Sequence, residues 1–261
     1  DVREGMYMMS KRYCFIWLLA IVVCLGLPPV SRASEAKKHP LDKSESRKLV
    51  LNNDLKVLLI RDAKFNKSAA SLVVGVGSLS NYGTRQGMAH FLEHMLFMGT
   101  EKYPGVDEYV QFISDNGGWR NAYTTVDHTN YFFDVNHDAL EGALDRFSQF
   151  FVAPLFTKEY TEREMNAVNS EFQNNLENDG RRQRQLWVSL FRKDHPGNGF
   201  SVGSLETLGD AKREDLLAFY KKNYSADRMG LVILGKVQLD TLEQWARKYF
   251  SPIKNKGKGR L

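Results

Sequence analysis

One segment of the chain, Met88–Met98 (MAHFLEHMLFM), combines an almost unbroken run of apolar side chains with two histidines and a glutamate. The apolar side chains would cover most of the circumference of a helix, and a helix of this kind is buried. Burying imidazole and carboxylate groups without partners costs several kcal/mol for each ionic group. A bound metal ion would remove this cost. The segment therefore predicts a buried helix that carries a metal site.

The polar residues of this helix have the spacing of a catalytic metal site. His90 and His94 are four residues apart and Glu93 lies three residues after His90, so the three side chains share one face. A catalytic zinc ion takes three protein ligands and keeps one position open for water. A carboxylate beside that water can accept its proton and later pass a proton to the leaving amine. The order is the inverse of the familiar His-Glu-x-x-His helix.

A third ligand has to come from elsewhere in the chain. Thr157 is a good N-cap for a long helix that runs to about Asn178 and is rich in glutamate. Two of its glutamates, Glu164 and Glu171, are seven residues apart and share a face about 10 Å apart along the axis. One of them can bind the metal while the other orients a ligand. The spacing alone leaves open which of the two is the ligand.

The remaining pattern alternates between strands and helices, which predicts an α+β fold in which a largely antiparallel sheet packs against helices, with the metal-binding helix buried against it. β-branched and apolar runs predict strands over Lys56–Arg61, Ser68–Val76, Trp119–Thr125, Thr129–Val135 and Met229–Leu234. Helical patterns cover Asp107–Asp115, Asp138–Phe151, 186–192, 213–223 and Leu239–Phe250, and Gly180 is expected to end the long helix that begins after Thr157.

The N-terminus has the order of a secretory signal. Lys11 and Arg12 precede the apolar run Cys14–Leu27, and small residues follow up to Ala33. The run is short for a membrane span, which needs about 20 residues. We therefore expect residues 1–33 to be a signal peptide and the protein to be exported to the periplasm or secreted, meeting the membrane only during export. A retained anchor is the alternative.

The other segments and the composition limit the kinds of partner. Residues 34–47 are polar and predict an exposed lead-in to a domain over 48–253, and the basic, glycine-containing residues 254–261 predict a linker. The net charge of +5 on 261 residues is modest, so no nucleic-acid partner is expected. Both cysteines lie within the predicted signal, so a metal site in the exported chain has to use histidine and carboxylate.

The metal-site segments resemble those of a known family. The run Gly87–Thr100, continuing to Pro104, resembles the active-site segment of the pitrilysin and insulin-degrading enzyme family of inverted zincins. The segment Glu164–Glu171 resembles the distal ligand segment of that family. Within the family, the chain resembles the N-terminal catalytic domain of a bacterial pitrilysin-like protease. The resemblance runs from about residue 45 to the end of the chain. It implies one Zn²⁺ per chain held by His90, His94 and Glu171, with Glu93 as catalytic base and Glu164 as a second carboxylate beside the site.

A third segment, Gly117–Thr124, resembles the strand on which this family binds the substrate backbone. An edge strand can add an extended peptide through main-chain hydrogen bonds. On this interpretation Asn121 and Ala122 contact the substrate, and Phe97 and Tyr123 form walls for its side chains. The alternative is that Asn121 is a turn residue and that the two aromatic residues belong to the core.

The function implied is a zinc-dependent endopeptidase that hydrolyses peptides and small unfolded polypeptides. The resemblance also implies a C-terminal half of the same protein that helps to close a chamber around the substrate. A zinc-stabilised peptide-binding or assembly domain without turnover of its own is the alternative from a different class. The arginines that follow Gly180 are expected to form a solvated face or an inter-domain contact, and they are Arg181, Arg182 and Arg184.

Overall fold

The computed structural model describes residues 38–81, 83 and 85–259, and the predicted signal segment 1–33 lies outside them. The chain divides into two units, Asp1–Lys43 and Ser44–Leu261. Of the first unit, residues 38–43 are described, and they contain a turn closed by a hydrogen bond from the Asp42 amide to the His39 carbonyl. Among the described residues, no helix is both long and apolar enough to cross a membrane.

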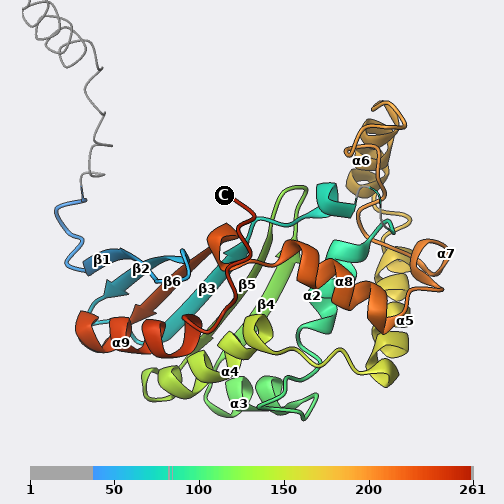
Figure 1. Ribbon diagram of the computed structural model, residues 1–261. Helices are drawn as coiled ribbons and strands as arrows, with labels where there is room; N and C mark the ends of the chain where they lie inside the picture. Colours follow the sequence, from blue (N-terminus) through green and yellow to red (C-terminus); the bar gives the residue numbers. More distant parts are fainter. Residues whose placement is uncertain (1–37, 82, 84, 260–261) are drawn as a thin grey trace, which may run out of the picture. The chain divides into compact units, whose positions relative to one another are not determined.

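The second unit is built on one six-stranded sheet with the strand order β1-β2-β6-β3-β5-β4 (Figure 1). Neighbouring strands are antiparallel except β2 and β6, which are parallel. The prediction of a largely antiparallel sheet is therefore confirmed. The strands are β1 (Glu45–Val50), β2 (Lys56–Arg61), β3 (Ser68–Val74), β4 (Trp119–Thr124), β5 (Thr129–Val135) and β6 (Met229–Gly235).

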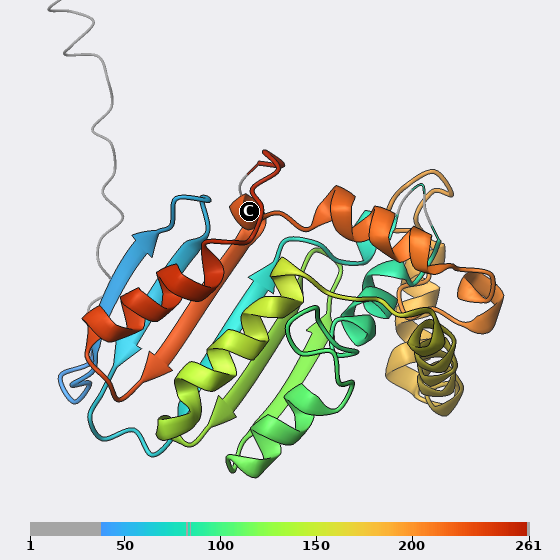
Figure 2. The same cartoon turned by 60° about the horizontal axis from the view of Figure 1, so that its bottom comes forward.

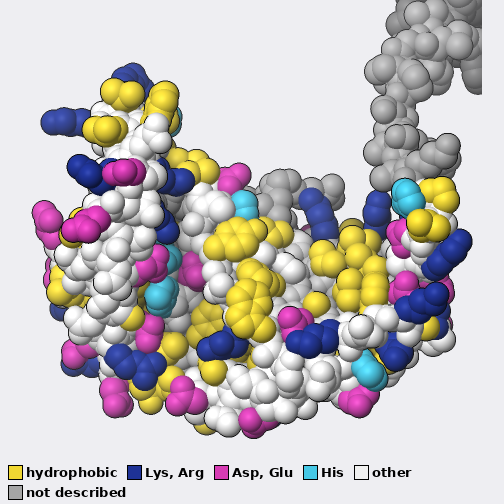
Figure 3. Space-filling view, turned by 180° about the vertical axis from the view of Figure 1, so that it is seen from behind, with side chains coloured by type: hydrophobic (Ala, Val, Ile, Leu, Met, Phe, Trp, Pro, Cys, Tyr) yellow, Lys and Arg dark blue, Asp and Glu magenta, His cyan; other side chains and the backbone are white. Residues whose placement is uncertain are grey.

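One face of the sheet packs against helices. Side chains alternate between buried and half-buried along β3, β5 and β6, because successive residues of a strand point to opposite faces. Figure 2 shows the helices α3 (Glu108–Asp115), α4 (Leu140–Val152) and α9 (Leu239–Phe250) side by side over the same face. On the other face, seen from behind in Figure 3, hydrophobic side chains reach the surface.

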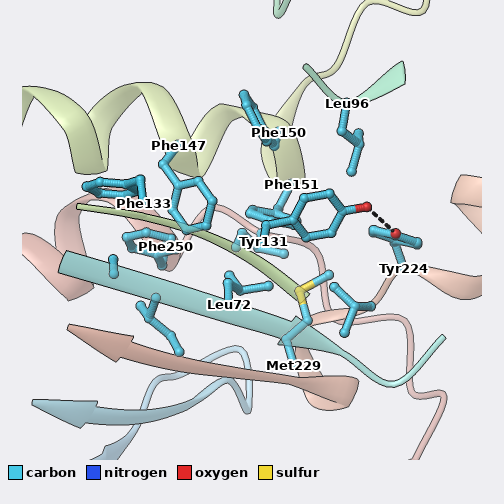
Figure 4. Packing of buried hydrophobic residues seen from close by; sticks show 14 of the residues in the cluster. Leu72, Leu96, Tyr131, Phe133, Phe147, Phe150, Phe151, Tyr224, Met229 and Phe250 are labelled. Atoms are coloured by element: carbon cyan, nitrogen blue, oxygen red, sulfur yellow. Dashed lines mark hydrogen bonds between the residues drawn. The ribbon is translucent and has the colours of Figure 1, made fainter. Parts of the chain in front are cut away.

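The core between sheet and helices contains a cluster of aromatic rings (Figure 4). Phe133 of β5 packs edge-to-face on Phe147 of α4, with ring centroids 5.2 Å apart. Tyr131, also on β5, is fully buried, and its hydroxyl lies 2.8 Å from that of Tyr224, at the end of helix α8 (Arg213–Asn223). These contacts join strand β5 to helices from distant parts of the sequence.

Helix α2 (Met88–Met95) lies at the β4 side of this core and contacts β4, β5, α8 and α5 (Lys158–Asn174). Its apolar residues Phe91, Leu92 and Met95 are completely buried, which confirms the predicted burial of this helix. The helix ends at Met95, with Leu96 as its C-cap, and is shorter than the predicted segment by three residues. The fold is therefore α+β, with the histidine-bearing helix packed against the edge of the sheet.

Further elements differ from the predictions. The long helix ends at Asn174, and a separate helix α6 (Asp179–Ser189) begins after Asn178, whose side chain accepts a hydrogen bond from the Arg181 amide. Gly180 therefore lies within the start of α6 and does not end the preceding helix. Residues 45–47 belong to the edge strand β1, so the expected lead-in is shorter than predicted. Strand β1 was not predicted because its residues are mostly polar. Such a composition is common in an edge strand, and β1 pairs with β2 along one edge.

The connections contain further short elements, and the C-terminal segment lies against one of them. The short elements are η1 (Ser78–Asn81), η2 (His137–Ala139), α7 (Leu205–Leu208) and η3 (Ala226–Arg228). The amides of Lys256 and Gly259 donate hydrogen bonds to the side chains of Ser225 and Asp227, at 2.8 and 2.7 Å. The described part of the predicted linker, residues 254–259, is thus fastened to the turn at η3.

Candidate metal centre

The orientation of His90 depends on a close contact between two glycines. Gly87, at the start of α2, has a positive φ of 89°, and a Cβ at this position would collide with the backbone of Gly203. This approach brings the neighbouring Val202 carbonyl to 2.7 Å from Nδ1 of His90. A carbonyl oxygen only accepts, so Nδ1 carries the hydrogen and Nε2 is left as the free ligand atom.

His94 is oriented by a carboxylate of helix α5. Its Nδ1 lies 3.2 Å from Oε2 of Glu164, whose other oxygen, Oε1, accepts hydrogen bonds from Arg163. The rings of His90 and His94 are 4.9 Å apart and nearly perpendicular. Both imidazoles are therefore held at Nδ1, and each presents Nε2 to the space between α2 and α5, as is usual for metal-binding histidines.

Glu171 of α5 lies at the free side of both rings. Its Oε2 is 3.3 Å from Nε2 of His90 and 3.8 Å from Nε2 of His94. One ligand atom from each of the three residues lies within 4.8 Å of the others. A tetrahedral zinc ion with bonds of about 2.0–2.1 Å separates its ligand atoms by about 3.3 Å. The three side chains fit a zinc ion, and Glu171, not Glu164, completes the set.

The charged groups of the site shift one another's pKa values. The neighbouring imidazoles of His90 and His94 lower the pKa of Glu171 well below its ordinary value. Burial alone would lower the pKa of His94, but the carboxylates of Glu164 and Glu171 outweigh burial and raise this pKa to about 9. Burial alone would raise the pKa of Glu164, and the hydrogen bond with His94 reverses the shift. The two glutamates are thus held as carboxylates beside the imidazoles.

Glu93 differs from these carboxylates because it is buried without a cationic hydrogen-bond donor. Only 8% of the residue is exposed, and its Oε2 accepts a 2.5 Å hydrogen bond from the hydroxyl of Thr124 on β4. Burial raises the pKa of Glu93 above its ordinary value, although His90 and the Thr124 hydrogen bond oppose the rise. A carboxylate with a raised pKa is a better proton acceptor, which suits a general base.

Two cavities meet at Glu93 and His94. The larger, about 440 Å³, extends from the two histidines and Glu171 along β4 to α6. The smaller, about 250 Å³, is lined by the apolar side chains of Phe97, Met98 and Val110, together with Arg120 and Glu164. Glu93, His94, Asn121 and Ala122 line both cavities.

The four residues expected to contact substrate all line these cavities. Asn121 is exposed on β4, and its side-chain oxygen accepts a hydrogen bond of 2.9 Å from the Ala122 amide. Phe97 borders the smaller cavity but also packs on core rings, with its centroid 5.2 Å from that of Phe150. Tyr123 is 46% exposed and borders the larger cavity. Phe97 therefore has a core role as well, and substrate contact remains a prediction for all four.

Several residues of the site escaped the sequence analysis. Thr124 and the Val202 carbonyl orient Glu93 and His90, and neither has a side-chain pattern that distinguishes it in the sequence. Thr129 of the neighbouring strand lies beside Thr124, with the hydroxyls 3.2 Å apart. Arg181 and Arg184, expected on a solvated or inter-domain face, are exposed but line the larger cavity. The only sequence feature that could have linked these two arginines is their spacing of three residues, which places them on one face of a helix.

Comparisons with known proteins agree with this geometry. A family model described as insulinase (peptidase family M16) matches residues 56–194, and a model described as the peptidase M16 inactive domain matches residues 210–261. The crystal structure of pitrilysin is similar in fold and sequence, with a TM-score of 0.82 and 38% identity over 86% of this chain and 24% of that chain.

Curated relatives show the same likeness. The A-factor-processing enzyme of Saccharomyces cerevisiae is 49% identical over 85% of this chain and 22% of its own length. The human insulin-degrading enzyme is 45% identical over 88% of this chain and 23% of its own length. A relative from Schizosaccharomyces pombe, 48% identical over 88% of this chain and 25% of its own length, carries the words zinc protease in its name.

The chain thus spans about a quarter of the length of these relatives. The matched family model covers both α2 and α5, the two helices that bring the histidines and the glutamates together. The sequence match, the fold match and the His-His-Glu grouping point to the same group of metallopeptidases. On this evidence the chain belongs to the insulinase family of peptidases, family M16.

Proposed function

We propose that this chain forms the metal-binding part of a zinc-dependent endopeptidase that hydrolyses peptides and small unfolded polypeptides. One observation carries the proposal: the carboxylate of Glu93 lines the same cavity as His90, His94 and Glu171, beside the edge strand β4. A zinc ligand set, a proton acceptor and a strand able to bind an extended chain are the parts that peptide hydrolysis requires.

His90, His94 and Glu171 would hold the zinc ion through Nε2, Nε2 and Oε2. When bound, zinc supplies a Lewis acid that polarises the scissile carbonyl and makes water more acidic. Glu93 takes a proton from the attacking water and delivers it to the nitrogen of the leaving amine. Thr124 donates to Oε2 of Glu93, which leaves Oε1 available for this proton transfer. Burial of Glu93 favours the protonated form that it has to adopt between the two steps.

The substrate backbone would lie along β4. This strand pairs with β5 on one side, and no other described strand pairs with it, so its outer edge can accept an extended peptide. The Ala122 amide points to this edge, because its present acceptor is the side chain of Asn121. A peptide carbonyl could take the place of the Asn121 oxygen, and the released amide group of Asn121 could then bind the peptide as well.

The whole protein is proposed to contain a further part that closes the chamber around the substrate, since relatives extend about four times as far as this chain. We also propose export to the periplasm or the exterior, directed by a signal peptide over residues 1–33. The mass of the mature N-terminus tests this, because cleavage after Ala33 leaves Ser34 first. An uncleaved N-terminus would instead favour a retained anchor.

The test of the enzymatic proposal is cleavage of an unstructured peptide by the zinc-loaded chain, with Glu93→Gln as the control. The assay is run with the chain alone and after adding the remaining part of the protein. Cleavage that disappears in Glu93→Gln, in either arrangement, supports the proposal. Zinc binding without cleavage in both arrangements would refute it and leave the peptide-binding or assembly domain as the function.

A further inference from the structure

The larger cavity has a positively charged wall that the proposed hydrolysis does not use. Arg181 and Arg184 of α6 line this cavity together with Tyr123 and Thr124 of β4 and the three candidate metal ligands. The two arginines are three residues apart in a helix and therefore project from the same face of α6. Two guanidinium groups thus border the space that a peptide on β4 would occupy.

The hydrogen-bonding capacity of these arginines is largely unused. The Nη2 atom of Arg181 lies 3.9 Å from Oε1 of Glu171, which exceeds hydrogen-bond distance, and half of the Arg181 side chain is exposed. Arg184 forms no ion pair with any residue in the described part of the chain. Glu171 is already engaged by the two histidines on its other oxygen. Both arginines can therefore bind an added anion.

The two cavities differ in chemistry on either side of the catalytic groups. Phe97, Met98 and Val110 give the smaller cavity an apolar wall beside the opposite charges of Arg120 and Glu164, whereas Arg181 and Arg184 give the larger one a cationic wall. Glu93 and Ala122 line both cavities and lie where they meet. A peptide that crosses this junction would place one side chain in each cavity. The side chain on one side of the cleaved bond would then meet the apolar wall, and the side chain on the other side would meet the cationic wall.

We propose that Arg181 and Arg184 form a carboxylate-binding subsite that selects an acidic group of the peptide on the α6 side of the cleaved bond. The inference rests on the proposed function, because it assumes that the peptide lies along β4. Arginine binds carboxylates through two parallel hydrogen bonds, and these charge-assisted bonds are about twice as strong as neutral ones. The carboxylate can belong to an Asp or Glu side chain or to the C-terminus of a short peptide.

The experiment measures binding and cleavage of a matched peptide series. The peptides are unstructured and carry a single Glu at successive positions, with Gln at the same position as the uncharged counterpart. A second pair compares a free with an amidated C-terminus. Binding is measured by fluorescence anisotropy to the zinc-loaded Glu93→Gln chain, and cleavage is measured with the unsubstituted chain. The binding measurement remains informative if no peptide is cleaved, so failure of the subsite and failure of the proposed function are distinguishable.

The variants are Arg181→Gln, Arg184→Gln and the double variant, with Arg182→Gln as the matched control. Arg182 is on the same helix but is paired with Asp179 and does not line the cavity. We expect Glu to bind about five- to tenfold more tightly than Gln at one position, because the bonds are charge-assisted but solvent weakens them. The double variant should bring this ratio close to one, whereas Arg182→Gln should keep it. The ratio should also fall at high salt.

The outcomes distinguish a side-chain carboxylate from a C-terminal carboxylate, and two of them would overturn the proposal. A preference for Glu that is independent of the C-terminal group assigns the subsite to acidic side chains, and a preference only for the free C-terminus assigns it to the chain end. Equal binding of Glu and Gln with no effect of the free C-terminus overturns the proposal. A preference for Glu over Gln that persists in the double variant also overturns the proposal. Zinc content is measured in every variant, because Arg181 lies near Glu171 and Arg184 does not share that contact.

Discussion

The hydroxyl of Thr124 donates a 2.5 Å hydrogen bond to Oε2 of Glu93, which ties the end of the edge strand β4 to the middle of helix α2. Thr124 lies 3.2 Å from the hydroxyl of Thr129, which donates to the carbonyl of Val76. Each hydroxyl has one hydrogen, so with these donations the two threonine hydroxyls are in contact without a hydrogen bond between them, and the link from the sheet to Glu93 is the single bond from Thr124. The strand proposed to bind the substrate and the residue proposed to activate water are held at a set distance from each other.

Replacing Thr124 by valine should lower kcat about tenfold while leaving the zinc content unchanged. The variant keeps the shape of the side chain but removes the donor to Glu93, and a hydrogen bond to a charged group contributes about 1.5–3 kcal/mol net. A tenfold loss of rate is about 1.4 kcal/mol, near the lower end of that range. The measurement compares kcat and bound zinc per chain. Thr124→Ser keeps the hydroxyl and should retain most of the activity. Equal kcat for the valine variant would contradict an orienting role.

Removing a metal ligand should abolish both zinc binding and turnover. His94→Ala and Glu171→Ala each leave two ligands, and two ligands do not hold zinc tightly in a catalytic site. The check is metal content after dialysis against a weak chelator, with circular dichroism to establish that the fold persists. Glu93→Gln, which is not a ligand, should keep its zinc and lose activity by at least about a hundredfold. Zinc retained at full stoichiometry in Glu171→Ala would exclude Glu171 as a ligand.

Glu164→Gln should weaken zinc binding without abolishing it. Glu164 holds Nδ1 of His94 at 3.2 Å, and loss of such a partner typically reduces metal affinity about 10–100-fold. Competition with a chromophoric chelator measures this affinity. Glu162→Gln is the matched control, because Glu162 is on the same helix but exposed. A Glu164→Gln affinity equal to that of the control would show that the hydrogen bond does not support His94.

The free energy of unfolding should fall above about pH 10. Burial raises the pKa of the Tyr131 and Tyr224 phenols well above their ordinary value, so they stay protonated in the folded chain while they ionise in the unfolded chain. The unfolded state then binds fewer protons than the folded state, and stability declines as pH rises. Each such phenol contributes a slope of about 1.4 kcal/mol per pH unit.

Urea unfolding at several values between pH 9 and 11 tests this dependence. Replacing both tyrosines by phenylalanine should reduce the slope, because the two buried groups no longer ionise on unfolding. Tyr123→Phe is the control. Because Tyr123 is 46% exposed, this substitution should leave the slope unchanged. An unchanged slope in the double variant would mean that other groups carry the alkaline transition.

Local pattern determined the helix α2 and most of the strands. The apolar residues around His90 and His94 could be satisfied only by burial, and the four-residue spacing places both imidazoles on one face of any helix. The alternation in β5 and β6 likewise followed from one face packing on the core. The edge strand β1 and the break between α5 and α6 were missed, because a polar strand and a side-chain cap at Asn178 leave weak signals in a sequence.

The sequence by itself therefore identified the candidate groups of the centre: two histidines, a nearby carboxylate and a helix of glutamates that could complete the set. Only the tertiary structure decided which glutamate meets both Nε2 atoms, because Glu164 and Glu171 share a face of α5 and are two turns apart along that helix. The partners Thr124 and Val202 and the cationic wall of Arg181 and Arg184 come from segments far from α2 in sequence. Such contacts depend on how elements pack, and no local spacing encodes them.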